Sequence, residues 1–200
     1  MKRSLKRSVK RSWTLTALVV LTGFAALAFI HAPTLQSSVN QHPLVALEQA
    51  TRSYAYSESW AQLSEQNDKY WQVQQLAWTI RVVLGATVQI VPRAMIPVNG
   101  DIAGVTLIQE RSIFVNNKLH TNAQLSTLAH EAGHLLQPGT LAYPQVEVSA
   151  EGVAYLVSKH FGEDNLHSHA RYLAQYKTGL SVLDVYRAEI EYAARILQGK

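Results

Sequence analysis

The chain of 200 residues contains no cysteine. Disulfide bonds, cysteine ligands to zinc and a thiol nucleophile are therefore excluded, and cysteine usage does not indicate a cellular compartment. Charged residues are also scarce, at 16% of the chain against 48% hydrophobic residues. This balance is compatible with one globular domain that carries an additional apolar segment.

The body of the chain also lacks a cluster of basic residues. The formal net charge of +4 depends on six lysines and arginines within the opening stretch MKRSLKRSVKRS. Without these six of the 18 basic residues, 12 remain against 14 acidic residues, so the body is near −2. Domains that bind nucleic acid usually carry lysine and arginine clustered on one face. We therefore expect nucleic acid not to be a partner.

An uncharged apolar stretch follows the basic tail (residues 1–12). It runs from Trp13 to Ile30, and a helix of these 18 residues would span roughly 27 Å, close to the thickness of the bilayer hydrocarbon. We predict an uncleaved transmembrane anchor. A secretory signal cleaved near the small-x-small pattern from Ala26 to Ala28 is the alternative, and a buried core helix is disfavoured by the preceding basic run. In both membrane interpretations residues 1–12 stay cytoplasmic and the rest of the chain is exported.

Residues 31–41 are polar and are predicted to form a linker, and residues 42–200 are predicted to form one domain. Apolar residues at three- and four-residue spacings predict helices between about residues 42 and 86. We expect the tryptophans of this region to be core or packing residues, with a ligand-binding box as the alternative. They are Trp60, Trp71 and Trp78.

The remainder of the domain combines short strands with four helices. Runs rich in β-branched residues predict strands at 87–91, 103–109 and 112–116, the last two as a hairpin. The first helix has Thr121 as its N-cap, in a capping box with Gln124. The other three helices are predicted at 144–160, 165–177 and 182–198. These elements predict an α+β fold, mostly helical, with a small antiparallel β-sheet.

The helix from Thr121 contains the sequence LAHEAGHLLQ at residues 128–137. His130 and His134 are four apart, so their imidazoles lie one turn apart on the same helix face. Glu131 is displaced by about 100°, near enough to hold a water molecule without binding the metal itself. This HExxH pattern is typical of zinc hydrolases, in which the metal lowers the pKa of its water to about 7 and the glutamate takes the proton. Two surface histidines beside a coincidental glutamate are the alternative.

A third ligand is needed, because a catalytic zinc site usually takes three protein ligands. The candidates are Glu147 and Glu151, which are the first charges of the next helix. The connection between the helices is short, which predicts antiparallel packing with Glu147 opposite His134 and Glu151 opposite His130. By spacing alone either glutamate can supply the ligand, and a solvated carboxylate face is the alternative for both.

HExxH followed by Glu147-x-x-x-Glu151 resembles the gluzincin arrangement of thermolysin-like peptidases. The stretches LSTLAHEAGHLL and EVSAEGVAY are more similar to the ImmA/IrrE-type metallopeptidases and to the metallopeptidase domain of ArdC-type antirestriction proteins. The similarity covers about residues 87 to 162. It implies a zincin-like domain.

The resemblance also implies a role for each matched residue. Zn2+ would be bound by His130, His134 and Glu147, and Glu131 would be the general base. Glu151 would hold a ligand histidine by a hydrogen bond, or serve as the alternative third ligand.

We therefore expect a zinc-dependent metallopeptidase that hydrolyses a peptide or protein substrate with a zinc-activated water. Its location would be the membrane, through residues 13–30, with the catalytic domain outside the cytoplasm; a secreted protein is the alternative. Two other functions stay open, namely a non-catalytic zinc-stabilised module that binds a protein, and an antirestriction-type factor acting near nucleic acid.

An electrophilic partner for the reaction is not selected by the sequence. The candidates are Tyr143, Tyr155, His167, His169 and Tyr172. His167 and His169 are two apart near a helix start, where their side chains diverge, so we interpret both as surface residues.

Overall fold

The computed structural model describes residues 42–53 and 69–200, apart from residues 138 and 164. The predicted tail, membrane segment and linker, and also Trp60, lie outside the described residues. Among the helices that are described, none has both the length and the apolar character needed to cross a bilayer.

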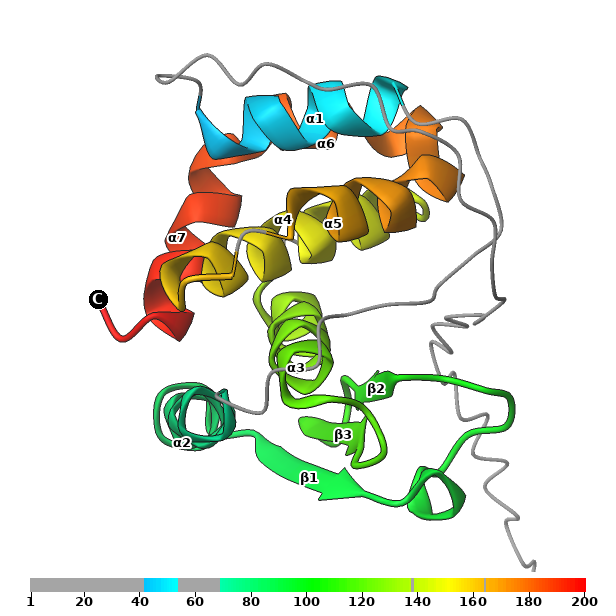
Figure 1. The fold of residues 1–200 in the computed structure, drawn as a ribbon, viewed down its shortest axis with the longest axis vertical. Coiled ribbons are helices and arrows are strands. Elements are labelled where there is room, and N and C mark those ends of the chain that lie inside the picture. The colour runs from blue at the N-terminus through cyan, green and yellow to red at the C-terminus, as the bar shows by residue number, and fades with distance from the viewer. Residues whose placement is uncertain (1–41, 54–68, 138, 164) are drawn as a thin grey trace, which may run out of the picture.

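The described chain is α+β and mostly helical, as predicted. Figure 1 shows α3 between a group of helices that includes α4 and α5 and a small sheet. The elements are α1 (Pro43–Ser53), α2 (Tyr70–Leu84), β1 (Thr87–Val91), the 3-10 helix η1 (Arg93–Met95), β2 (Gly104–Leu107), β3 (Ser112–Asn116), α3 (Thr121–Leu136), α4 (Gln145–His160), α5 (Leu166–Leu173), the 3-10 helix η2 (Ala174–Gly179), α6 (Val182–Val185) and α7 (Arg187–Leu197).

The sheet has three strands in the order β1-β3-β2. The predicted hairpin of β2 and β3 is confirmed, with Val105 opposite Phe114. The prediction of a wholly antiparallel sheet is wrong, because β1 pairs with β3 in parallel, with Val88 opposite Ile113. After β1 the chain passes through η1 to the far edge of the sheet, so that the hairpin returns β3 alongside β1 in the same direction.

Several predicted helix boundaries also change. Thr121 is the first residue of α3 and His120 occupies the N-cap position, so the predicted capping box is wrong. The side-chain amide of Gln124 instead donates to the carbonyl oxygen of Leu119 at 2.7 Å. The two predicted C-terminal helices are each divided. The first changes to the 3-10 helix η2 at Ala174, and non-helical backbone at Tyr186 separates α6 from α7.

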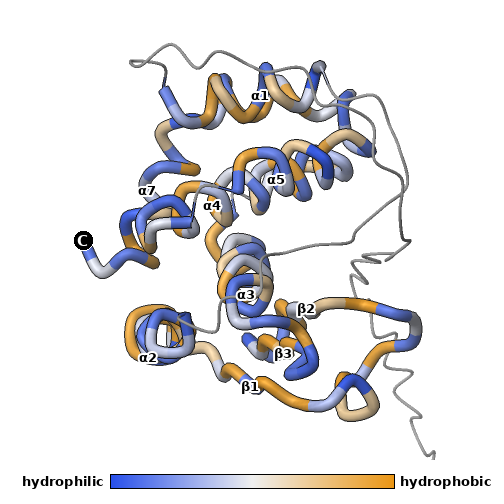
Figure 2. The backbone as a smooth tube through the Cα atoms, viewed as in Figure 1, coloured by the Kyte–Doolittle hydropathy of each residue, from blue (hydrophilic) through white to orange (hydrophobic). Residues whose placement is uncertain are grey.

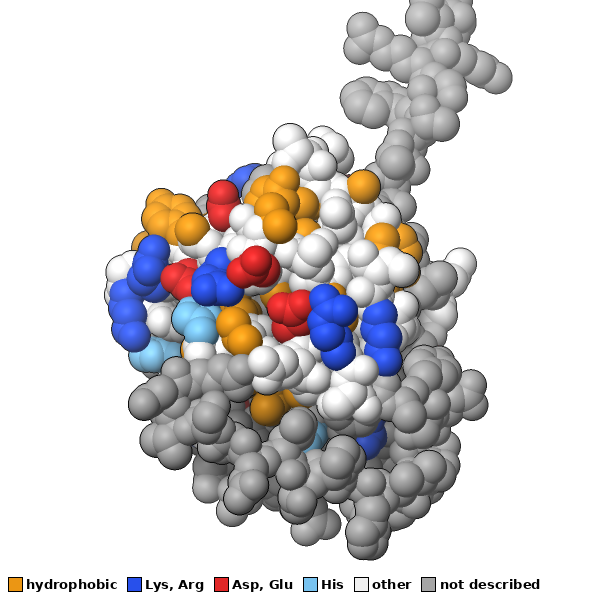
Figure 3. All heavy atoms as spheres, turned by 90° about the horizontal axis from the view of Figure 1, so that it is seen from above, with side chains coloured by type: hydrophobic (Ala, Val, Ile, Leu, Met, Phe, Trp, Pro, Cys, Tyr) orange, Lys and Arg blue, Asp and Glu red, His pale blue; other side chains and the backbone are white. Residues whose placement is uncertain are grey.

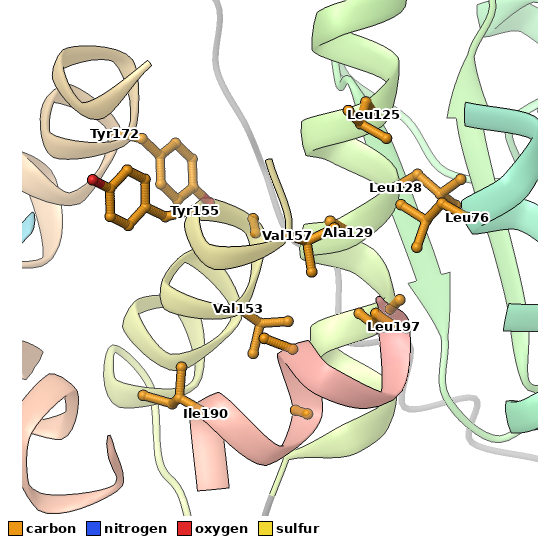
Figure 4. Packing of buried hydrophobic residues seen from close by; sticks show 14 of the residues in the cluster. Leu76, Leu125, Leu128, Ala129, Val153, Tyr155, Val157, Tyr172, Ile190 and Leu197 are labelled. Atoms are coloured by element: carbon orange, nitrogen blue, oxygen red, sulfur yellow. The ribbon is translucent and has the colours of Figure 1, made fainter. Parts of the chain in front are cut away.

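A hydrophobic core links α3 to its neighbours on both sides. Figure 4 shows Leu125 and Leu128 of α3 directed toward Leu76 of α2, and Val153 of α4 near Ile190 of α7. Apolar and polar positions alternate around the helices in Figure 2, as expected where one face is buried. The core therefore fixes α3 against both the helices and the sheet.

A core position is wrong for Trp71 and Trp78, because their exposed fractions are 77% and 61%. The buried stripe of α2 is formed by residues at three- and four-residue spacings, including Val73, Leu76 and Ile80. Two tryptophans seven apart share one helix face, and here it is the face opposite that stripe.

Charged side chains of both signs are interspersed on the face seen in Figure 3. Arg52 pairs with Glu48 within α1 at 2.6 Å, and Arg187 of α7 pairs with Asp184 of α6 at 2.5 Å. Charges that are mixed in this way do not produce a strong field of one sign over that face.

Candidate metal centre

The centre depends on a close crossing of α3 and α4. Gly133 of α3 lies against Ala150 of α4, where a Cβ added at position 133 would be only 3.1 Å from the Cα of Ala150. The absence of a side chain lets the two helix backbones approach. The polar side chains on either side of this contact consequently meet inside the protein.

His130, His134 and Glu147 form one buried group. Nε2 of His130 lies 3.1 Å from Nε2 of His134 and 3.5 Å from Oε2 of Glu147. Nε2 of His134 lies 3.8 Å from Oε1 of Glu147. One ligand atom from each residue lies within 4.8 Å of the others, so this group could hold a metal ion.

These separations can be compared with those expected around a small tetrahedral ion. Bonds of about 2.0–2.1 Å at tetrahedral angles keep nitrogen and oxygen ligands about 3.3 Å apart. The separation of 3.1 Å between the two Nε2 atoms is close to this value, whereas Glu147 approaches the histidines through different oxygens, with Oε2 3.5 Å from His130 and Oε1 3.8 Å from His134. The donor set, two imidazoles and one carboxylate, is also one that zinc accepts.

Glu151 lies behind His130 and outside this group. Its Oε2 is 2.7 Å from Nδ1 of His130, and its Oε1 is 2.6 Å from Nδ1 of His169. Burial raises the pKa of Glu151, but the nearby His169 and His130 outweigh burial and lower it to about 2. An ionised carboxylate can only accept hydrogen bonds, so both Nδ1 atoms donate. His130 thereby presents Nε2 to His134 and Glu147.

Glu131 is held on the other side of α3 by strand β2. The Thr106 hydroxyl is 2.8 Å from Oε2 of Glu131 and 2.8 Å from its carbonyl oxygen. Gly104 leaves room for the side chain, because a Cβ there would lie 3.2 Å from Cγ of Glu131. Burial raises the pKa of Glu131 to about 7, although the neighbouring charge of His130 and the Thr106 hydroxyl lower it. The carboxyl group is therefore poised to exchange a proton near neutral pH.

The pKa values of the two histidines in the group are shifted in opposite directions. Burial lowers the pKa of His130, but hydrogen bonds with Glu147 and Glu151 raise it well above its usual range. Burial and the charge of His130 lower the pKa of His134 to about 4. In the metal-free protein the proton therefore belongs to His130, and neutral His134 accepts its Nε2–H.

Helix α5 supplies two contacts that the sequence did not predict. The interpretation of His169 as a surface residue is wrong, since only 2% of it is exposed and it contacts Glu151. The hydroxyl of Tyr172 donates to Oε2 of Glu147 at 2.8 Å. His167 is exposed, as expected. His169 and Tyr172 belong to the buried stripe of α5, which also contains Ala170 and Leu173.

The other two candidate tyrosines pack against aromatic side chains outside the group of three. Tyr155 packs its ring against His169, with centroids 5.4 Å apart. Tyr143 is exposed and packs against Tyr176. Among the five candidates, Tyr172 donates a hydrogen bond to a member of the group, Glu147.

Thr106 is a further residue that sequence reasoning missed. It lies two positions after Gly104 on β2, and alternate residues of a strand share one face. The small residue and the hydroxyl therefore both face Glu131, which is 25 positions away from Thr106 in the chain.

Comparisons of the chain with protein-family models, with curated proteins and with solved structures found no match.

Proposed function

We propose that the protein is a zinc-dependent metallopeptidase. The observation that carries the proposal is the convergence of one ligand atom each from His130, His134 and Glu147. Glu131, on the same helix as the two histidines, supplies a carboxyl group with a pKa of about 7. Three ligands of this kind beside one unused carboxylate are typical of a catalytic zinc site.

Zinc is proposed because its preferred ligands and geometry agree with the group. Histidine nitrogens and a carboxylate oxygen bind it at about 2.0–2.2 Å, usually in a tetrahedron. When bound, zinc supplies Lewis acidity, which lowers the pKa of water and polarises a carbonyl group. His130, His134 and Glu147 would hold the ion, and three protein ligands leave one position open.

Each surrounding residue has a distinct task in this proposal. Glu131 accepts a proton from the attacking water and passes it to the leaving amine, for which a pKa near neutrality is suited. Thr106 keeps the carboxyl group of Glu131 in place through its 2.8 Å hydrogen bond. Tyr172 holds Oε2 of Glu147, and Glu151 fixes the ring of His130.

The substitution Glu131→Gln tests hydrolysis separately from metal binding. We expect the variant to retain zinc and its peptidase activity to fall by a factor of about 100 or more, because a positioned general base contributes at least that much. The matched control is Glu110→Gln, at an exposed position in the turn between β2 and β3. Full activity of the Glu131 variant would refute the proposed mechanism.

A zinc-stabilised module that binds another protein without catalysis is the second candidate. It is favoured by the burial of the group, because only 1% of Glu131 and 5% of each histidine are exposed. Burial of this kind opposes the access that a peptide substrate would need to the metal. Hydrolysis of an unselective peptide mixture, measured with and without a chelator, distinguishes the two, since only the peptidase would show chelator-sensitive cleavage.

The proposed location, outside the cytoplasm, is supported by the basic tail and the apolar stretch of residues 13–30. A membrane-anchored protein would remain in the membrane fraction after an alkaline wash. Release of the catalytic domain from cells at the size expected for cleavage near Ala28 would instead support the secreted alternative.

A further inference from the structure

We propose that His169 is a positioning residue for the metal centre: it holds the carboxylate of Glu151, which in turn orients His130 toward the metal. The inference rests on the metal-binding part of the proposed function and not on hydrolysis.

The geometry is a continuous chain of two short contacts. His130 donates from Nδ1 to Oε2 of Glu151 at 2.7 Å, and His169 donates from Nδ1 to Oε1 at 2.6 Å. Each carboxylate oxygen therefore has its own imidazole partner. A carboxylate that is held at both oxygens cannot rotate about its last bond, so the direction in which it accepts from His130 is fixed.

Removal of His169 would leave one carboxylate oxygen of Glu151 buried and without its donor. Glu151 is among the buried charged residues of the protein. An unsatisfied buried ion is costly, so the side chain would turn to find another donor or admit water. Either response changes the angle at which Glu151 meets His130, and with it the direction of the Nε2 lone pair.

The alternative is that His169 is an ordinary core residue. Its other ring nitrogen, Nε2, is buried and has no hydrogen-bond partner among the described residues. A position selected for packing alone would favour an apolar side chain, since an unpaired buried polar atom carries a cost. A histidine with only one hydrogen-bonded ring nitrogen beside Ala170 and Leu173 is explained if the contact of its Nδ1 with Glu151 is needed for function.

Helix α5 is well placed to act as a rigid support for this contact. Tyr172 lies one turn after His169 and donates to Glu147, which is one turn before Glu151 on α4. The ring of Tyr155 packs edge-on against His169, with centroids 5.4 Å apart. Figure 4 shows Tyr155 and Tyr172 next to each other, between α4 and α5. One helix thus supports both acidic residues that serve the centre.

The test is the zinc dissociation constant of the full chain in detergent, measured by competition with a chromophoric chelator. We expect His169→Leu, which lacks the donor, to bind zinc about tenfold more weakly, the lower end of the range for residues behind a ligand. His169→Asn keeps an N–H group in a planar side chain and should stay within about threefold of the wild type. His167→Leu, the same change at an exposed position of α5, is the control and should bind as the wild type does.

The outcomes separate the two proposals. A wild-type chain that binds no zinc would overturn the proposed function and this inference with it. A wild-type chain that binds zinc, together with His169→Leu of equal affinity, would overturn the role of His169 alone. Equal losses in His169→Leu and His169→Asn would also overturn it, because shape and not the donor would then matter.

A double-mutant cycle covers the case in which His169→Leu does not fold. Because His169 acts through Glu151, the loss of about tenfold expected from His169→Phe, which keeps a ring but lacks the donor, should shrink toward zero when Glu151 is already changed to Gln. Losses that simply add in the double variant would show that His169 acts by another route, and would contradict the proposal.

Discussion

Nδ1 of His130 and Oε2 of Glu151 lie 2.7 Å apart, and this buried contact joins the HExxH helix α3 to α4. The pair explains why two glutamates four apart on α4 have different tasks. Oε2 of Glu147 lies 3.5 Å from Nε2 of His130, on the opposite edge of the ring from the atom that Glu151 contacts. Glu151 therefore orients the imidazole of His130, and Glu147 lies near the other nitrogen of that ring in the candidate metal site.

Zinc affinity should rise with pH, because a metal ion must displace the proton of His130. Hydrogen bonds with Glu147 and Glu151 raise the pKa of His130 well above its usual range despite burial, so the metal-free group is protonated at neutral pH. Below that pKa, one released proton makes affinity increase about tenfold per pH unit, and the dependence ends above it. His134, with a pKa of about 4, contributes nothing near neutrality.

The pH dependence is best measured in the Glu131→Gln variant, which removes a second group that titrates near neutrality. Calorimetry in two buffers of different ionisation enthalpy would count the released protons. An affinity that does not change between about pH 6 and 8 would contradict protonation of His130 in the metal-free protein.

Thr106→Val should change hydrolysis while zinc affinity stays the same. The hydroxyl of Thr106 lowers the pKa of Glu131, which burial has raised to about 7. Loss of the hydroxyl should therefore move the acidic limb of the pH–rate profile to higher pH, because the base must be ionised to act. We expect a loss of about tenfold in rate at neutral pH.

The control for this change is Thr87→Val, at an exposed position of β1. An acidic limb that is unchanged in Thr106→Val would show that the strand does not tune the carboxyl group of Glu131.

Gly133→Val should destabilise the protein by forcing α3 and α4 apart. Its Cβ would lie 3.1 Å from the Cα and 3.3 Å from the carbonyl oxygen of Ala150, and backbone atoms cannot move aside as a side chain can. Overpacking of this kind costs about 1–3 kcal/mol. Urea unfolding in the presence of a chelator measures the loss without a contribution from metal, and Gly139→Val, at a position with open space, is the control.

The pairing across α3 and α4 could be predicted because both of its causes are local. The HExxH spacing places His130 and His134 on one face, and the short connection brings α4 against that face. The predicted pairing of Glu151 with His130 is found, whereas Glu147 lies near both histidines and not opposite His134 alone. The β2–β3 hairpin was predictable for the same reason, since its strands are neighbours in the chain. In contrast, the parallel pairing of β1 with β3 depends on the path taken between residues 92 and 103, which no local pattern shows.

The supporting residues could not be predicted, because their contacts depend on tertiary packing. His167 and His169 diverge on α5, and spacing alone does not say which of the two points inward. The contact between Thr106 and Glu131 joins a strand to a helix. The buried stripe of α5 was the available signal for His169, since Ala170 and Leu173 lie on the same side.

The most direct test of the centre is metal analysis of the full chain as wild type, Glu147→Ala and Glu151→Ala, each loaded with zinc and then freed of excess. We predict about one zinc ion per chain in the wild type and almost none in Glu147→Ala, which loses a ligand. Glu151→Ala should still bind zinc, with affinity reduced about 10- to 100-fold because His130 loses its support. An empty Glu151→Ala protein beside a fully loaded Glu147→Ala protein would contradict the account.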